Sequence, residues 1–162
     1  MDSYLDKIKI GKVRINNPLA LAPMAGVNWL AFRLLCKKYG GGLIYTPMVP
    51  VDGFLKLWDD DKKRCKELYL DINDDERPLN IQLVGSKKEK MQDTAEIISK
   101  YADIIDVNLG CPESSILANK AGSYLIKHPD QIERVVSPVV ESSKVPVTAK
   151  IRIGWDDKSK NY

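Results

Sequence analysis

The sequence predicts an α/β fold, namely the amino-terminal five β-α units of a (β/α)8 TIM barrel preceded by a β-hairpin. Five short apolar runs alternate with longer amphipathic or charged stretches, which is the pattern of parallel strands joined by helices. An alternating apolar and polar segment precedes the first run, and in a barrel such a hairpin can plug the amino-terminal end. No Gly-x-Gly-x-x-Gly follows the first run, so a dinucleotide site of Rossmann type has no support.

The length leaves two architectures open. A five-stranded doubly wound sheet could be complete within 162 residues, whereas a (β/α)8 barrel of roughly 250 residues would be only partly present. The hairpin favours the barrel. We therefore expect residues 1–162 to form an incomplete barrel domain, with a hairpin plug over 1–18 and strands 1 to 5 with their helices over 19–162.

The hairpin is predicted over residues 8–15, where apolar and polar residues alternate on both sides of a turn near Gly11. The first parallel strand is predicted over 19–24, which is an almost continuous apolar run. Asn28 can then cap a helix over 29–39, which has helical spacing and ends at three glycines.

The second unit begins with a strand over residues 43–46. A looser stretch through 52–54 follows, and then a charged helix around 60–70, whose basic run over 62–64 is interpreted as a solvated face rather than an RNA contact. An exposed loop is predicted over 74–78.

The third unit is a strand over residues 79–84 followed by an amphipathic helix from about 88 to 100. Ser86 and Glu89 have the spacing of a capping box, which predicts the start of this helix.

The fourth unit is a buried strand over residues 104–109, broken by Gly-Cys-Pro and followed by a loop over 110–122. A helix is predicted to begin near 128–130, and Pro138 should end or kink it. The fifth strand is predicted over 145–153.

The composition is that of a globular protein, with 44% hydrophobic and 29% charged residues. The net charge of +3 permits an anionic partner such as nucleic acid but does not require one. Cys36, Cys65 and Cys111 contain no C-x-x-C pair, so neither a metal site nor a disulfide framework is indicated. Because no run approaches the roughly 18 apolar residues of a membrane span, we expect a soluble, cytoplasmic protein.

Cys111 is the candidate for chemistry, because it follows a predicted strand and stands between glycine and proline. The structural alternative is that the turn simply needs a small residue. Thiols with an ordinary pKa of about 8.5 are mostly protonated at neutral pH and can act as general acids, whereas a nucleophilic cysteine needs a neighbouring base or cation. The only histidine, His128, is interpreted as a surface or capping residue, which argues against a Cys-His hydrolase.

Polar side chains also interrupt the predicted strands near their carboxyl ends. Lys150 and Arg152 stand two apart on the fifth strand and so share one side of the sheet, while Gln82 and Asn108 interrupt the third and fourth. A lysine in a buried strand is costly unless it faces an anion or a polar ligand, although a strand-end lysine can also reach solvent. Together the three strands predict a polar site for a heterocycle.

Four stretches resemble the tRNA-dihydrouridine synthases in order and spacing, and the resemblance covers residues 9–157. They are Ala-Pro-Met-Ala-Gly-Val from Ala22, Gln-Leu-Val-Gly from Gln82, Asp-Val-Asn-Leu-Gly-Cys-Pro from Asp106, and Pro-Val-Thr-Ala-Lys-Ile-Arg-Ile-Gly-Trp from Pro146. The resemblance implies a flavoprotein oxidoreductase that reduces the C5–C6 double bond of uridine in tRNA, with FMN as cofactor and NADPH as reductant. It also implies roles for eight residues: Cys111 as proton donor to C5, Pro23, Met24 and Ala25 beside the isoalloxazine, Gln82 as its hydrogen-bond partner, Lys150 near its N1–C2=O edge, and Asn108 and Arg152 facing the uracil.

The sequence departs from the family in two respects. Where members often have a lysine four residues after the catalytic cysteine, this chain has Ser115. The further strands that grip the FMN phosphate, and the helical domain that holds tRNA, are absent from these residues, so we expect the chain alone to be weakly active or inactive. Two alternatives stay open: another FMN barrel acting on pyrimidines, such as a dihydroorotate dehydrogenase, and a non-catalytic fragment that completes a barrel with a second, carboxyl-half chain.

Overall fold

The computed structural model describes residues 8–160, whose strands form two sheets. The smaller is an antiparallel hairpin of β1 (Lys9–Ile10) and β2 (Val13–Arg14). The larger has the order β3-β4-β6-β7-β8, with β5 also paired to β6, and every pairing in it is parallel. Its strands are β3 (Ala20–Leu21), β4 (Leu43–Tyr45), β5 (Val49–Pro50), β6 (Leu79–Val84), β7 (Ile104–Asn108) and β8 (Val147–Lys150).

The strand order decides between the two predicted architectures. A doubly wound sheet reverses direction within its strand order, whereas a (β/α)8 barrel adds each strand beside the last, as this sheet does. The sheet is also curled. In a flat sheet β6 and β8 would lie about 10 Å apart, yet Asn80 Nδ2 on β6 donates to Thr148 Oγ1 on β8 at 3.3 Å. The prediction of an incomplete TIM barrel preceded by a hairpin is therefore confirmed.

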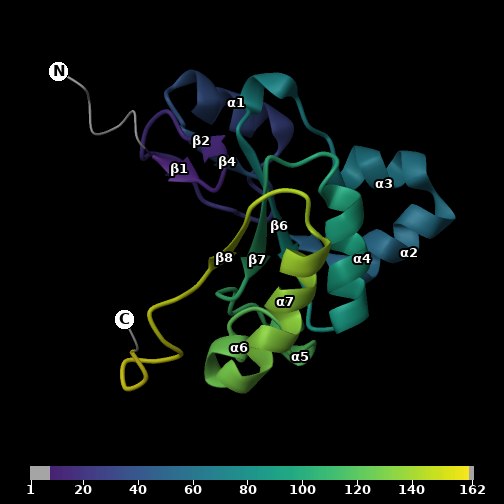
Figure 1. The fold of residues 1–162 in the computed structure, drawn as a ribbon, viewed down its shortest axis with the longest axis vertical. Coiled ribbons are helices and arrows are strands. Elements are labelled where there is room, and N and C mark those ends of the chain that lie inside the picture. Colours follow the sequence, from purple (N-terminus) through teal and green to yellow (C-terminus); the bar gives the residue numbers. More distant parts are fainter. Residues whose placement is uncertain (1–7, 161–162) are drawn as a thin grey trace.

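Helices cover the outer side of the curled sheet (Figure 1). They include α1 (Leu30–Lys38), α2 (Val51–Asp60), α3 (Lys62–Tyr69), α4 (Lys88–Ile98) and α7 (Ile132–Ser142). The short helices α5 (Ser114–Ala118) and α6 (Tyr124–Lys127) lie at one end of the sheet, and η2 (Asp74–Glu76) and η3 (Pro129–Gln131) are 3-10 turns. Within the described residues, no helix is both long and apolar enough to cross a membrane.

The two faces of each central strand differ in chemistry. Outward residues such as Ile81 and Val107 are buried in the main hydrophobic core together with helix residues such as Met91 and Val139. The inward residues Asn80 and Gln82 of β6 and Asp106 and Asn108 of β7 are buried but polar. Because successive side chains of a strand point to opposite faces, the outer face stabilises the fold while the inner face is available for a ligand.

The hairpin packs at the amino-terminal ends of the strands. Ile15 forms a second buried cluster with Leu43 of β4 and Ile104 of β7. In Figure 1 the hairpin lies at the end of the sheet opposite to α5 and α6. Gly11 has φ +56°, and a Cβ there would lie 2.7 Å from Pro146 Cγ, so glycine is needed for both the turn and the close approach.

A buried ion pair fixes the loop between β3 and α1. Arg33 Nε donates to Glu76 Oε2 at 2.6 Å, and the side chains are 4% and 0% exposed. Arg33 Nη1 also donates to Asn28 O at 2.7 Å. The Asn28 side chain in turn donates to Ala22 O at 2.7 Å and to Tyr45 O at 2.9 Å. Asn28 therefore holds this loop against β4 and does not cap α1 as predicted, because Trp29 is the N-cap residue.

Two predicted strands differ in extent, and the start of α2 was missed. β3 and β8 are shorter than predicted, since β3 pairs only with β4 and β8 only with β7. The stretch predicted as loose around 52–54 forms the start of α2, whose Val51, Phe54 and Trp58 have helical spacing and pack into the core. The basic run over 62–64 is exposed, as predicted.

Of three further local predictions, the first was wrong and the other two hold at least in part. Ser86 donates to Asn119 O at 2.7 Å instead of capping α4, whose N-cap is Lys87. Pro138, predicted to end or kink its helix, lies inside α7 and does not end it, since α7 continues to Ser142. His128, interpreted as a surface or capping residue, stands at the C-cap of α6 and the N-cap of η3, and its backbone N–H donates to Leu125 O at 3.1 Å. Its half-buried ring stacks on Tyr124 with centroids 4.2 Å apart.

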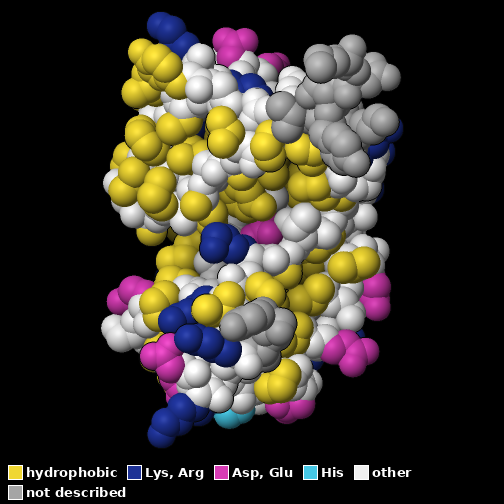
Figure 2. Space-filling view, turned by 90° about the vertical axis from the view of Figure 1, so that its left-hand side faces the viewer, with side chains coloured by type: hydrophobic (Ala, Val, Ile, Leu, Met, Phe, Trp, Pro, Cys, Tyr) yellow, Lys and Arg dark blue, Asp and Glu magenta, His cyan; other side chains and the backbone are white. Residues whose placement is uncertain are grey.

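The described sheet has two open edges, beside β3 and beside β8. Large apolar side chains flank both of them: Leu19 is 62% exposed and Ile151 is 63% exposed. Figure 2 looks at the side of the molecule where the hairpin and the segment after β8 lie. Hydrophobic side chains gather over much of this face, and in its middle basic side chains lie beside an acidic one.

Candidate functional site

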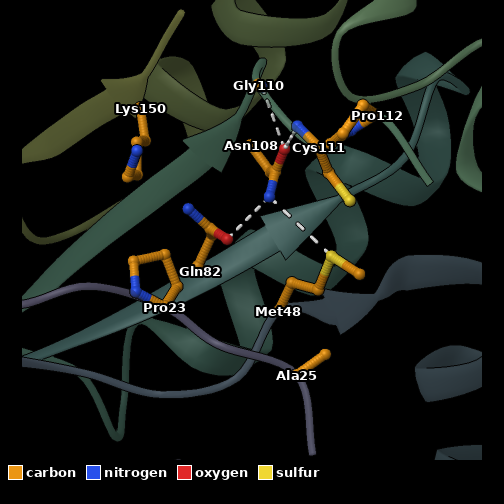
Figure 3. Close-up of a pocket in the computed structure, with 9 residues that line it drawn as sticks. All are labelled: Pro23, Ala25, Met48, Gln82, Asn108, Gly110, Cys111, Pro112 and Lys150. Carbon is orange, nitrogen blue, oxygen red and sulfur yellow. Dashed lines mark hydrogen bonds between the residues drawn. The ribbon is translucent and has the colours of Figure 1, made fainter.

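A cavity of about 230 Å³ lies at the carboxyl-terminal ends of the strands (Figure 3). It is lined by Pro23, Ala25, Met48, Gln82, Asn108, Gly110, Cys111, Pro112 and Lys150. These residues come from the loops after β3 and β4 and from the ends of β6, β7 and β8. In a parallel barrel this end of the strands is where active sites form.

The cavity brings together six of the eight residues singled out in the sequence: Pro23, Ala25, Gln82, Asn108, Cys111 and Lys150. The other two lie outside its lining. Met24 is exposed in the loop after β3, and Arg152 is exposed beyond the end of β8. A Cβ placed on Gly110 would lie 3.2 Å from Arg152 Cγ, so Arg152 packs beside the rim of the cavity.

A chain of hydrogen bonds runs beneath the cavity. Thr148 Oγ1 and Gln82 Nε2 donate to the two carboxylate oxygens of Asp106, at 2.6 and 2.7 Å. Asn108 Nδ2 donates to Gln82 Oε1 at 2.8 Å. Asn108 Oδ1 then accepts from the backbone N–H groups of Gly110 and Cys111, at 3.1 and 2.9 Å. These hydrogen bonds therefore link the carboxylate of Asp106, which is 1% exposed, to the backbone of Cys111, the candidate acid.

The backbone of Cys111 is held from its other side as well. Its carbonyl accepts from Ser123 N at 2.9 Å. Gly122, with φ +62°, comes so close that a Cβ on it would lie 2.6 Å from Cys111 O. The thiol itself is half-buried and faces the cavity beside Met48 and Asn108 (Figure 3). A rigid backbone thus presents a reachable Sγ.

Lys150 and Asp106 supply opposite charges at and below the cavity. Burial raises the pKa of Asp106, while hydrogen bonds from Gln82 and Thr148 and the charge of Lys150 act in the opposite direction. Burial likewise raises the pKa of Tyr45, and the Asp106 charge adds to that effect. Among the described residues, Lys150 forms neither a side-chain hydrogen bond nor a salt bridge, so its ammonium group is available to a bound anion or carbonyl.

The lining suits a planar heterocycle. Pro23, Ala25 and Met48 offer apolar surface, and Gln82 and Lys150 place amide and ammonium donors at one side of it. The side-chain nitrogen and oxygen of Gln82 each make one hydrogen bond within the protein, which leaves one N–H and one lone pair for a ligand.

Sequence reasoning missed Met48 and Asp106. Nothing in the sequence marked Met48, which reaches the cavity from the loop between β4 and β5 and accepts a long contact of 3.7 Å from Asn108 Nδ2. Asp106 did carry a signal, because a lone carboxylate inside an apolar strand requires buried partners. His128 is not in the cavity lining, and residues 8–160 contain no group of three His, Cys, Asp or Glu that could hold a metal ion.

Comparisons with known proteins agree on one family. A family model described as dihydrouridine synthase (Dus) matches residues 20–162. The tRNA-dihydrouridine synthase B of Vibrio vulnificus is 37% identical over 155 residues, which are 95% of this chain and 47% of that protein. The proteins of the same name from Pseudomonas syringae and Escherichia coli K12 are 37% and 36% identical over 97% and 95% of this chain, and over 45% and 47% of their own lengths. The chain thus spans about half the length of these relatives.

Proposed function

The chain belongs to the dihydrouridine synthase family, and on this basis we propose that its cavity serves the reduction of the C5–C6 double bond of uridine in tRNA. The proposed cofactor is FMN and the proposed reductant is NADPH. The observation that carries the proposal is the position of Cys111, which shares one cavity with the Gln82 amide and the free ammonium group of Lys150. The printed names of the relatives, tRNA-dihydrouridine synthase B, support the choice of tRNA.

The residues present fit a flavin ring. Pro23, Met24 and Ala25 would border the isoalloxazine, and Gln82 would hydrogen-bond its polar edge through the N–H and the lone pair left free by Asp106 and Asn108. When bound, reduced FMN supplies a hydride to C6 of the uracil. Lys150 would lie near the N1–C2=O edge, where a cation favours the anionic reduced ring.

Cys111 would complete the reduction by giving its thiol proton to C5 of the uracil. One hydride at C6 and one proton at C5 add the two hydrogens by which dihydrouridine differs from uridine. The thiol needs no base for this role, and no histidine lies in the cavity lining. Because Cys111 is half-buried rather than sealed, water can return a proton to the thiolate afterwards.

Asn108 and Arg152 would orient the uracil. One N–H of Asn108 donates to Gln82 Oε1. The other contacts Met48 Sδ, a weak acceptor that a uracil carbonyl could replace. Arg152 beside Gly110 could reach a carbonyl or phosphate at the rim. Ser115 stands where relatives often have a lysine, and it hydrogen-bonds Glu113 instead.

The proposed partner chain follows from the two open edges of the sheet. The open edges beside β3 and β8, with their exposed apolar side chains, favour closure of the barrel by further strands, whether from the same polypeptide or from a carboxyl-half chain. A tRNA-modifying enzyme acts where tRNA matures, so we place this activity in the cytoplasm.

The test uses a bacterial strain whose own dihydrouridine synthases have been deleted. Cells expressing the chain are compared with cells expressing Cys111→Ala, and dihydrouridine is measured in purified tRNA by mass spectrometry. We expect at most weak dihydrouridine formation with the original chain alone, stronger formation when a carboxyl-half chain is co-expressed, and loss of both with Cys111→Ala. Purified protein is titrated with FMN in parallel, and both forms should bind the flavin equally.

Cys36→Ala is the matched control, because Cys36 is a free, half-buried thiol outside the cavity lining. It should leave the dihydrouridine content unchanged. Dihydrouridine formation by Cys111→Ala at the original level would refute the role of Cys111. Absence of FMN binding together with absence of product, with the carboxyl-half chain co-expressed, would refute the proposed function of the chain.

A further inference from the structure

Asp106 lies below the cavity, is not among its lining residues, and has no role in the reaction outlined above. It sits at the centre of β7, is 1% exposed, and accepts hydrogen bonds from Gln82 and Thr148. Burying a carboxylate is costly even when it is hydrogen-bonded. The cost calls for an explanation, and the direction of the hydrogen bonds offers one.

A carboxylate can only accept hydrogen bonds. Gln82 must therefore turn its NH₂ group toward Asp106, which leaves Oε1 to face Asn108. Asn108 must then turn its own NH₂ group toward Gln82, which leaves Oδ1 for the backbone of Cys111. Each amide has only one orientation that satisfies both of its neighbours. The orientation of Gln82 that Asp106 requires therefore also fixes the orientation of Asn108, whose Oδ1 faces the N–H of Cys111.

We propose that Asp106 is a positioning residue, which fixes the backbone of Cys111 through the amides of Gln82 and Asn108. Its catalytic consequence rests on the proposed function of Cys111 as the acid. The hydrogen-bond relay itself does not, since every link is within the chain. Without an acceptor at position 106, Gln82 can flip, and its NH₂ group then opposes that of Asn108. Asn108 is driven to flip as well and presents donors to the N–H groups of Gly110 and Cys111.

Two substitutions separate orientation from charge. Asp106→Leu removes every acceptor. Asp106→Asn removes the charge but can keep its carbonyl toward Gln82, because its NH₂ group can face Thr148 Oγ1, an oxygen with two lone pairs that accepts from Asn80 Nδ2 and also interacts with the Tyr45 hydroxyl. The proposal therefore expects Asp106→Asn to preserve the backbone of Cys111 and Asp106→Leu to release it.

The measurement is amide hydrogen exchange followed residue by residue by NMR on the purified chain. Exchange is read at Gly110 and Cys111 and divided by that at Ser99, whose N–H bonds Ala95 O at the end of α4. A lost hydrogen bond at these amides should accelerate their relative exchange by about fivefold in Asp106→Leu. Asp106→Asn should stay close to the original chain.

Asp103→Leu is the matched control. Asp103 also accepts two hydrogen bonds between β6 and β7, from Leu79 N at 2.7 Å and Arg77 Nη1 at 2.9 Å, but at the opposite end of the strands. This variant should accelerate exchange at Leu79 and leave Gly110 and Cys111 at the original ratio. If Asp106→Leu folds poorly, Gln82→Met breaks the relay one step later and should produce the same local acceleration.

Three results would overturn the proposal. They are unchanged exchange at Cys111 in Asp106→Leu, equal acceleration in Asp106→Asn and Asp106→Leu, and an acceleration that Ser99 shares in full. In an active enzyme, Asp106→Leu should lower kcat with little change in KM for tRNA, and Asp106→Asn should restore most of it. Because amide exchange requires neither flavin nor tRNA, a failure here leaves the proposed function standing, and a failure of the dihydrouridine assay leaves the relay standing.

Discussion

Replacing Gly122 by alanine tests how tightly the fold holds Cys111. Gly122 has φ +62°, a conformation that costs an L-residue about 1–2 kcal/mol. Its new Cβ would also lie 2.6 Å from Cys111 O and 2.8 Å from Ile116 Cγ2, so atoms must move. Cys111 O accepts the Ser123 N–H at 2.9 Å, and losing that bond would cost about 1 kcal/mol more. We expect a total destabilisation of about 2–4 kcal/mol, the upper part reflecting residual strain at the contact.

Gly40→Ala separates the cost of the backbone conformation from the cost of the close contact. Gly40 has φ +97°, and a Cβ on it would meet no atom within 4 Å. Only the backbone strain applies there, about 1–2 kcal/mol. The free energy of unfolding of both variants is measured by urea titration and compared with the original chain.

The alkylation rate of Cys111, measured by peptide mass spectrometry, reports the local consequence. In Gly122→Ala the thiol should react at a different rate from the original, whereas in Gly40→Ala the rate should be unchanged. Equal destabilisation by the two substitutions, with Cys111 reacting as before in both, would refute the reasoning that Gly122 supports the site by close packing.

Three further predictions concern buried and exposed charges. Glu76→Gln leaves Arg33 buried without a counter-charge and should cost about 3–5 kcal/mol in urea unfolding, whereas Arg33→Met with Glu76→Leu should cost less than the sum of its single substitutions. The pKa of Asp52 is lowered chiefly by its hydrogen bond from Lys90. The Asp52 carboxylate therefore stabilises the fold at pH values above its unfolded pKa of 3.8, and this stabilisation is lost as pH falls through its folded pKa. Asp52→Asn should reduce the loss of stability below pH 4, measured by urea unfolding at several pH values. Lys150→Met should weaken FMN binding at least about tenfold in a fluorescence titration, if its ammonium group meets the flavin as proposed.

The parts of the fold that were predicted well depend on local patterns. β6 and β7 were found because their buried runs are bounded by turn residues, and α1 because its apolar residues have helical spacing. α2 was missed although Val51, Phe54 and Trp58 carry the same spacing, because Gly53 and the nearby prolines suggested a loop. Its signal was present but was outweighed by residues that usually interrupt helices.

The parts that failed depend on partners distant in sequence. The side chains of Asn28 and Ser86 were predicted to cap the helices that follow them, and both bond instead to backbone carbonyls on other segments. A local rule cannot see such competitors. The same limit explains the site: polar residues could be assigned to strand ends one by one, but the hydrogen bonds that order them through Asp106 join three strands.

The alternation along the central strands explains why one sequence stretch can carry both stability and chemistry. In β7, Ile105 and Val107 face the helices, while Asp106 and Asn108 face the interior, where Gln82 meets them from β6. A slip of β7 by one residue would exchange these faces and place a carboxylate in the hydrophobic core. The apolar positions therefore fix the register that aligns the polar ones. Substitutions at Ile105 should act on stability alone, whereas those at Asp106 should act on the backbone of Cys111, although the two residues are adjacent.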